Sequence, residues 1–285
     1  EMAFCDWSSD VCSSDLSTLV DWLWAHGLGE GGPTPASLAR AAVICKADLV
    51  SEMIKDGKEF TKLEGFIGAR YAELAGEPAE VCRAIVRHYF PRSASSELPG
   101  DITSSVLSIA DRLDTLAGCW LAGFAPTGAK DPYALRRHVL AIVRILLDLR
   151  KSLDLDAAIA FALSQYSGRS AAADQEQARA AIGEFVQTRL AGYLAEAGGR
   201  DPAVLRAVLP VHWRDPQAAL DWSGALEGFR GRTDFQALAT GFKRCRNILK
   251  GSVLPAAERA GCFDRWLGGG RGAGGEDFSG LPEPA

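Results

Sequence analysis

The residues most able to do chemistry in this sequence lie between 108 and 137, and they begin with two aspartates. Asp111 and Asp114 fall on one face of a segment whose opposite face is apolar. The apolar positions recur at three- and four-residue spacing, which predicts an amphipathic helix: Val106, Ile109, Leu113, Leu116 and Trp120. Such a helix must position both carboxylates on its polar face.

Basic residues follow these aspartates after a turn. Pro126 and the Thr127-Gly128 pair break the helix, and Asp131 followed by Pro132 is typical of a cap and a first helical turn. The helix that starts there is expected to carry Arg136 and Arg137 near its beginning, with Lys130 just ahead of it.

A second group of cations lies on the last clear helix of the chain. Its apolar positions fall on one side of the helix: Phe235, Leu238, Phe242, Cys245 and Leu249. Lys243, Arg246 and Lys250 collect on a neighbouring face, with Asn247 beside them. Such a face can neutralise RNA phosphates, and guanidinium groups can stack on unpaired bases. A solvated basic face near a helix carboxyl end is the alternative, and on the residues alone it is the better interpretation.

Composition limits the classes of protein that fit. With 285 residues and 47% hydrophobic content the chain can bury one large core or two smaller ones, and its net charge of −5 excludes a uniformly basic surface. No apolar run approaches the roughly 18 residues of a membrane span. The number of cysteines is odd and no C-x-x-C pair occurs among them, so we expect the protein to reside in a reducing cytoplasm. The cysteines are Cys5, Cys12, Cys45, Cys82, Cys119, Cys245 and Cys262.

The residues from Ser108 to Gly118 and from Pro126 to Arg137 together closely resemble the beta subunit of bacterial heterotetrameric glycyl-tRNA synthetases. Upstream the resemblance includes 41–49, 63–68 and 88–92, and downstream it reaches 242–250. It covers most of residues 17–250. Members of this family are much longer, so the chain is expected to be a carboxyl-terminal fragment.

The resemblance implies an all-α fold with two helical domains. Residues 17–166 would form a domain similar to the HD-type metal phosphohydrolases, and residues 174–250 an incomplete anticodon-binding domain of the DALR type. The Gly-, Arg- and Ser-containing stretch 167–173 is the expected boundary. Residues 1–16 repeat Ser-Ser-Asp without helical or strand period and are interpreted as a disordered, non-native leader. The glycine-rich residues 251–285 are expected to be a flexible tail.

The HD-like resemblance also assigns residues to a degenerate metal site. In those enzymes a His-Asp dyad ends a helix, and here Cys45 and Lys46 occupy the dyad positions. Asp111 or Asp114 would correspond to the distal metal-binding aspartate. A lysine ammonium puts positive charge where a cation should bind, so we expect no metal. His88 and His138 are the nearest further candidates for ligands, but a single imidazole on a helical face is more often structural.

The function that the resemblance implies is tRNA binding. The holoenzyme joins glycine to tRNA(Gly) with ATP and Mg²⁺, its catalytic centre belongs to the alpha subunit, and the two subunits form an α2β2 heterotetramer. We therefore expect no catalytic residue and no bound cofactor in this chain. The expected RNA-facing residues are Lys130, Arg136, Arg137, Lys243, Arg244, Arg246, Asn247 and Lys250. For the first three, structural pairing with Asp131 is an equal alternative. A metal-dependent nucleotide phosphohydrolase and a helical scaffold for the alpha subunit are the rival functions.

Overall fold

The computed structural model of the chain describes residues 9–29, 31–51, 63–128, 130–168 and 170–249. Within these ranges the chain is all-α, as predicted, and the only β-type pairing is an isolated bridge between Thr127 and Lys130. No helix in this part of the chain combines the length and the apolarity that crossing a bilayer requires. The predicted tail, 251–285, lies outside the described residues.

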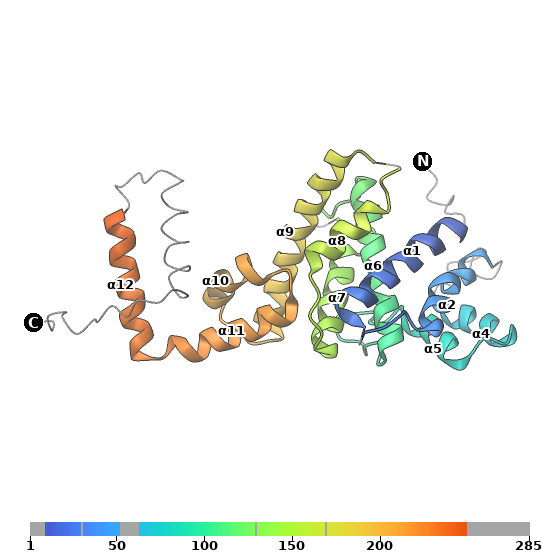
Figure 1. Cartoon of the computed structure of the whole chain (residues 1–285), viewed down its shortest axis with the longest axis horizontal. Coiled ribbons are helices and arrows are strands. Elements are labelled where there is room, and N and C mark those ends of the chain that lie inside the picture. Colours follow the sequence, from blue (N-terminus) through green and yellow to red (C-terminus); the bar gives the residue numbers. More distant parts are fainter. Residues whose placement is uncertain (1–8, 30, 52–62, 129, 169, 250–285) are drawn as a thin grey trace, which may run out of the picture. The chain divides into compact units, whose positions relative to one another are not determined.

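Figure 1 shows the helices along the chain. In chain order they are α1 (Ser9–Leu23), α2 (Ala36–Ile44), α4 (Phe66–Leu74), α5 (Ala79–Arg87), α6 (Ile102–Leu121), α7 (Leu135–Leu149), α8 (Leu155–Ser164), α9 (Ala172–Glu196), α10 (Pro202–His212), α11 (Pro216–Arg230) and α12 (Thr233–Leu249). Two single turns, Trp24–Leu28 and Ala47–Val50, follow α1 and α2. Contacts divide the chain into two compact units, 1–227 and 228–285, and the predicted boundary at 167–173 lies inside the first.

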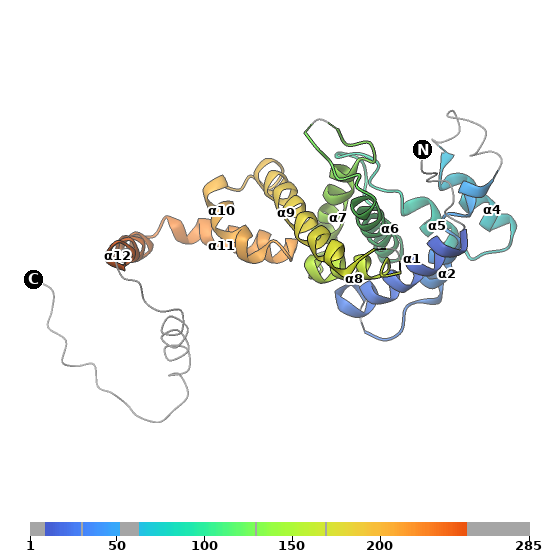
Figure 2. The same cartoon turned by 90° about the horizontal axis from the view of Figure 1, so that it is seen from above.

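Helix α6 forms the centre of the first unit. It begins at Asp101, whose side chain accepts a hydrogen bond of 2.8 Å from the Ser104 backbone N–H. It packs against α1, α2, α5, α7, α8 and α9, and Figures 1 and 2 both show α7 running beside it. The predicted apolar stripe is buried except for the half-buried Trp120, and Ser104 and Ser108 on other sides of the helix are buried as well. Burial nearly all round is typical of a core helix, whereas the sequence predicted an amphipathic one.

Helix α1 starts earlier than the sequence predicts. The irregular leader was expected to extend to residue 16, yet the helix begins at Ser9. Leu16, Leu19 and Leu23 are buried on one face, and α1 packs against α2, α6 and α8. Tertiary packing of this kind supports helix where local sequence signals are weak. Residues 1–8 lie outside the described part of the chain.

Helix α2 ends at Ile44. After it, Asp48 is fully buried, and its Oδ2 accepts a 2.7 Å hydrogen bond from the Gly65 backbone N–H. A Cβ atom on Gly68 would lie 3.2 Å from Asp48 Cγ, and one on Gly65 would lie 2.7 Å from Tyr89 Cδ2. The backbone therefore packs closely against its neighbours at both glycines.

Candidate functional site

Lys46 and Asp111 are the predicted site residues that the structure brings into direct contact. Lys46 follows the end of α2, and Asp111 lies in the middle of α6. Lys46 Nζ is 2.8 Å from Asp111 Oδ1, and the two side chains are 27% and 16% exposed. The same Nζ lies 4.5 Å from the centre of the Tyr89 ring. The ammonium group of Lys46 is thus the cation that Asp111 binds in this structure.

Electrostatics keep both members of this pair charged. Burial opposes the charge on Lys46, but Asp111, together with smaller contributions from Tyr89 and Cys45, outweighs burial and the pKa of Lys46 is raised. Burial likewise opposes the charge on Asp111, and Lys46, with smaller contributions from His88 and Arg112, lowers the pKa of Asp111 below its ordinary range. The pair therefore remains an ion pair throughout the neutral pH range.

Cys45 and Asp114, the other two positions of the predicted degenerate metal site, have different partners. Cys45 is fully buried, its Sγ lies 3.6 Å from the Ala42 carbonyl oxygen, and burial raises the pKa of the thiol to about 12. Asp114 Oδ1 accepts a 2.8 Å hydrogen bond from the hydroxyl of Tyr166, which follows α8. Over the described ranges, no three His, Cys, Asp or Glu side chains gather closely enough to hold a metal ion.

Two histidines lie near the ion pair and are both neutral at pH 7. His88 is fully buried and donates from Nδ1 to the Ile85 carbonyl oxygen at 2.7 Å. Burial, with a smaller contribution from Lys46, lowers the pKa of His88 to about 3. Burial also lowers the pKa of His138 to about 4. In the described part of the chain, His88 Nε2 and His138 Nδ1 are buried atoms without a hydrogen-bond partner.

A cavity of about 410 Å³ lies beside the ion pair, among the end of α2, α6 and the start of α7. It is lined by Lys46, Glu64, Tyr89, Pro91, Arg92, Asp111, Arg112, Thr115, Ala134, Arg137 and His138. Of these lining residues, Lys46, Asp111, Arg137 and His138 were predicted site residues, and the others were not. The only signal for Tyr89 and Arg92 was their place in the 88–92 motif, which carried the resemblance without a role.

Arg112 holds one wall of this cavity in place through hydrogen bonds. Its guanidinium group is 5% exposed and donates to the carbonyl oxygens of His88 at 2.9 Å, Tyr89 at 3.1 Å and Pro91 at 3.3 Å. It also bonds Ser108 within its own helix. Burial lowers the pKa of Arg112 to about 10, which leaves it cationic at neutral pH. Arg112 therefore fixes the 88–91 segment against α6.

Arg92 holds a second segment of the wall. Its Nη2 donates to the Glu64 carbonyl oxygen at 2.9 Å. Its guanidinium group lies 5.2 Å from the ring centre of Phe66 and 5.4 Å from that of Phe90. Stacked guanidinium groups keep their charge while covering apolar surface.

The loop before α7 determines which of the predicted basic residues have partners within the protein. Asp131 caps the helix as predicted, since its carboxylate accepts from the backbone N–H groups of Leu135 at 2.8 Å and Arg136 at 3.1 Å. The helix nevertheless begins at Leu135 and not at Pro132, because Ala134 adopts a left-handed conformation with φ +56°. Thr127 and Lys130 pair through two backbone hydrogen bonds of 3.0 and 2.7 Å.

Within this loop the three predicted cations differ. The Arg136 guanidinium donates to the Gly128 carbonyl oxygen at 2.6 Å and lies 3.9 Å from Asp131 Oδ2, so the structural alternative holds for this residue. Lys130 and Arg137 are exposed, and Arg137 lines the cavity. Considering the described residues alone, Arg137 has neither a hydrogen bond nor an ion pair from its side chain. RNA contact by any of the three stays a prediction.

Helix α12 presents the second predicted group in the unit 228–285. Lys243, Arg244 and Asn247 are exposed on it, as are the apolar Leu238 and Phe242. Arg246 belongs to the helix, but its side chain is not among those described, and Lys250 lies outside the described residues. The predicted helix is confirmed, and its contact with RNA remains a prediction.

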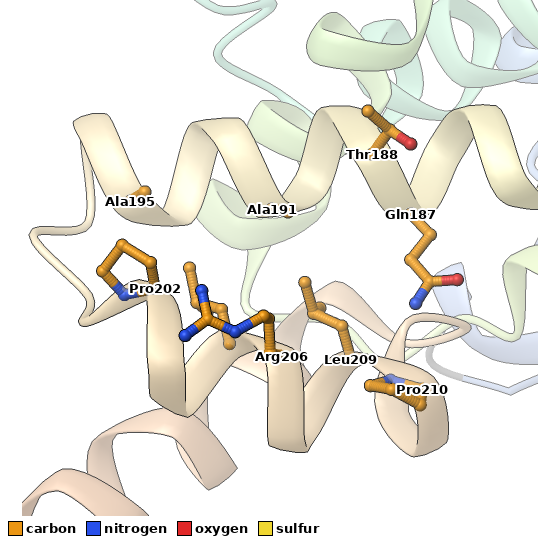
Figure 3. A pocket seen from close by; sticks show the side chains of 9 residues that line it. Gln187, Thr188, Ala191, Ala195, Pro202, Arg206, Leu209 and Pro210 are labelled. Atoms are coloured by element: carbon orange, nitrogen blue, oxygen red, sulfur yellow. The ribbon is translucent and has the colours of Figure 1, made fainter.

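A second cavity, of about 440 Å³, separates α9 from α10 and contains none of the predicted site residues. Figure 3 shows Gln187 on one helix and Arg206 and Leu209 on the other, all between the two helices. The remaining lining is mostly apolar: Thr188, Ala191, Ala195, Pro202, Leu205 and Pro210.

The sequence of this chain is similar to those of one family of known proteins. The sequence profile of the "Glycyl-tRNA synthetase beta subunit" family matches residues 14–210. The chain is 42% identical over 219 residues to the glycine–tRNA ligase beta subunit of Geobacter sulfurreducens, which covers 76% of this chain and 31% of that protein. It is 40% identical to the beta subunit of Geotalea daltonii, covering 80% of this chain and 33% of the relative.

A third relative, the glycine–tRNA ligase beta subunit of Myxococcus xanthus, is 40% identical over 237 residues, or 82% of this chain. The chain spans about a third of the length of the curated relatives it matches. A match that extends over residues 14–210 covers more than half of the sequence. This chain therefore belongs to the glycyl-tRNA synthetase beta subunit family.

Proposed function

We propose that this chain is a tRNA-binding part of a glycine–tRNA ligase beta subunit, which supports the ATP-dependent attachment of glycine to tRNA(Gly). The observation that carries the proposal is the family match over residues 14–210. The relatives are named as the beta subunit of a ligase that acts on tRNA. In this proposal the catalytic centre, which uses ATP and Mg²⁺, belongs to the alpha subunit of an α2β2 heterotetramer. The proposal assigns no cofactor to this chain.

Helix α12 is the proposed RNA-contacting surface. Lys243 and Arg244 are exposed cations, and Asn247 is an exposed amide three residues further along the same helix. Exposed cations neutralise phosphates at little desolvation cost, while an amide and a guanidinium group can also reach base edges. Arg246 and Lys250 extend the same basic stretch of sequence. Lys130 and Arg137 are proposed as secondary contacts in the first unit.

The proposed domain assignment follows the resemblance. Residues 17–166 are the HD-like helical domain, and residues 174–250 are the anticodon-binding-like helices. Family membership supports both assignments, because the profile match covers the whole of the first range and the beginning of the second.

A metal-dependent phosphohydrolase is the rival function, and the ion pair weighs against it. Hydrolysis of that kind needs oxygen and imidazole ligands around a divalent cation with a site left for water. Asp111 is instead bound at 2.8 Å by the Lys46 ammonium. A second cation beside this group would meet direct electrostatic repulsion.

The proposal is tested by removing the α12 charges. The variant Lys243→Gln, Arg246→Gln, Lys250→Gln should bind tRNA(Gly) more weakly, and its log affinity should fall less steeply with log salt concentration, by about 0.7 to 0.9 for each phosphate that the variant no longer neutralises. The matched control removes the same charge from three exposed arginines elsewhere: Arg70→Gln, Arg83→Gln, Arg206→Gln. Fluorescence anisotropy with labelled tRNA at several salt concentrations measures both quantities.

Two outcomes would contradict the proposal. An unchanged salt dependence in the α12 variant would remove this helix from the RNA-contacting surface. Failure of the unmodified chain to bind tRNA(Gly) at low salt, together with capture of a purified alpha subunit, would favour the scaffold function.

A further inference from the structure

The cavity beside the Lys46–Asp111 ion pair carries more positive than negative charge. Four of its lining side chains are cationic, namely Lys46, Arg92, Arg112 and Arg137, and two are carboxylates, Glu64 and Asp111. With a neutral His138, the lining has an excess of two positive charges. An excess of this size in a concave, partly dry site attracts anions.

Most of the donors in this lining already have partners inside the protein. Lys46 is bound to Asp111 at 2.8 Å, and Arg112 donates to backbone carbonyl oxygens of the 88–91 segment. Arg92 donates to the Glu64 carbonyl oxygen at 2.9 Å. These three groups contribute their charge to the cavity, while their hydrogen-bonding atoms hold its walls in place.

The first turn of α7 contributes the remaining cation of the lining. The Arg137 guanidinium is exposed and, within the described ranges, without a hydrogen bond or an ion pair. His138, the next residue, lines the same cavity, but its Nδ1 is a buried atom that solvent does not reach, so a ligand in the cavity does not reach it either. Arg137 therefore has donors available to a ligand in the cavity.

The amino end of α7 is not itself the binding element. The backbone N–H groups of Leu135 and Arg136 donate to the Asp131 carboxylate at 2.8 and 3.1 Å. The protein's own carboxylate therefore occupies the place where an anion would bind a helix end. Any anion in the cavity must be held by side chains.

We infer that this cavity binds the phosphate group of a phosphate monoester, with Arg137 as its direct hydrogen-bond donor. A phosphate monoester carries close to two negative charges at neutral pH, which matches the charge excess of the lining. The guanidinium fork fits two phosphate oxygens, and the charges of Lys46, Arg92 and Arg112 add to the attraction. A cavity of about 410 Å³ has room for an organic group on the phosphate.

Glu64 and Tyr89 indicate what that organic group would be. Tyr89 offers an aromatic ring and Glu64 a half-buried carboxylate acceptor in the same lining. A nucleobase can stack on an aromatic ring, and its amino groups or the sugar hydroxyls can donate to a carboxylate. The ligand class is thus a nucleoside monophosphate, either free or as the phosphorylated end of an RNA. The inference does not depend on the proposed tRNA contact, since it requires a ligand inside a cavity.

Isothermal titration of the whole chain with inorganic phosphate and with AMP tests the inference. Both should bind, AMP more tightly, and Arg137→Gln should weaken phosphate binding at least about tenfold, as expected when the charge-assisted hydrogen bonds of the guanidinium fork are lost. Arg83→Gln is the matched control, because Arg83 is an exposed arginine on α5 outside the cavity. Its affinity for phosphate should equal that of the unmodified chain.

A second variant and a second measurement guard against a change in folding. Arg137→Lys keeps the charge but loses the planar fork, and it should weaken phosphate binding less than Arg137→Gln does. Thermal unfolding followed by circular dichroism verifies that each variant is folded. Competition with two short RNAs that differ only in a 5′-phosphate distinguishes the sources: displacement of AMP by the phosphorylated RNA indicates an RNA end, and its absence indicates a free nucleotide.

The results that would overturn this inference differ from those that would overturn the proposed tRNA binding. If neither phosphate nor AMP binds at millimolar concentration, the inference is overturned even when tRNA binds through α12. If phosphate binds equally well to the unmodified chain and to the folded Arg137→Gln variant, the cavity is not the site. Loss of tRNA binding in the α12 variant with phosphate binding intact would leave the inference standing.

Discussion

Lys46 Nζ lies 2.8 Å from Asp111 Oδ1, and this contact joins the end of α2 to the middle of α6. The pair is mostly covered, with exposed fractions of 27% and 16%. A covered ion pair contributes little when compared with a well-packed apolar pair, but the loss of one partner leaves an uncompensated charge in a poorly solvated place. The ion pair thus matters most through what the removal of one partner would cost.

The first prediction is that Lys46→Met destabilises the chain by about 3 kcal/mol, because Asp111 keeps its charge and loses its main partner. Urea unfolding followed by circular dichroism measures the change in the free energy of unfolding. The double variant Lys46→Met, Asp111→Leu removes both charges and should recover most of the loss. Equal stability of the single variant and the unmodified chain would show that the ion pair has no energetic role.

The second prediction concerns the pH dependence of stability and rests on His88. The pKa of this ring is about 3 in the folded chain, below its ordinary value of 6.5. Between these values the unfolded chain binds a proton that the folded chain does not, so the free energy of unfolding decreases as the pH falls from about 6.5 towards 3. The contribution of His88 to this slope is at most about 1.4 kcal/mol per pH unit.

The variant His88→Asn separates this contribution from the others. Its side-chain amide can still donate to the Ile85 carbonyl oxygen but does not titrate. Urea unfolding between pH 7.5 and 4.5, at intervals of about half a unit, should give a shallower slope for the variant. His138, whose pKa is lowered to about 4, contributes equally to both proteins. Identical slopes would mean that His88 does not remain neutral on folding.

The third prediction concerns the packing of α9. A Cβ atom on Gly183 would lie 2.9 Å from the Trp213 ring, so Gly183→Ala should force the ring to move and cost about 1 to 3 kcal/mol. Gly192 on the same helix is the matched control, because its Cβ would meet nothing within 4 Å. Gly192→Ala should be neutral or stabilise the chain by up to about 1 kcal/mol. Thermal unfolding of the two variants measures the difference, and equal effects would contradict the close approach at Trp213.

Local sequence signals were sufficient to predict the helices and many of their ends. Three- and four-residue spacing predicted the segments that became α6 and α12. Asp131 was predicted as the cap of the next helix, and its carboxylate accepts from the backbone at the start of α7. These features are local: the periodicity of a helix and the chemistry of its cap depend on residues a few positions apart. The resemblance of several short motifs likewise sufficed to indicate the family.

The pairing of side chains, by contrast, became known only from the packed helices. Asp111 and Asp114 share one helix and were equal candidates, yet the first binds Lys46 and the second binds Tyr166. Arg136 and Arg137 are neighbours of the same type, but the turn before α7 ties the first to Gly128 and leaves the second at the cavity. Asp48, which follows the end of α2, likewise finds its partner at Gly65 in a later segment. Contacts between distant segments depend on how whole helices pack, and the spacing of residues within one helix contains no information about its neighbours.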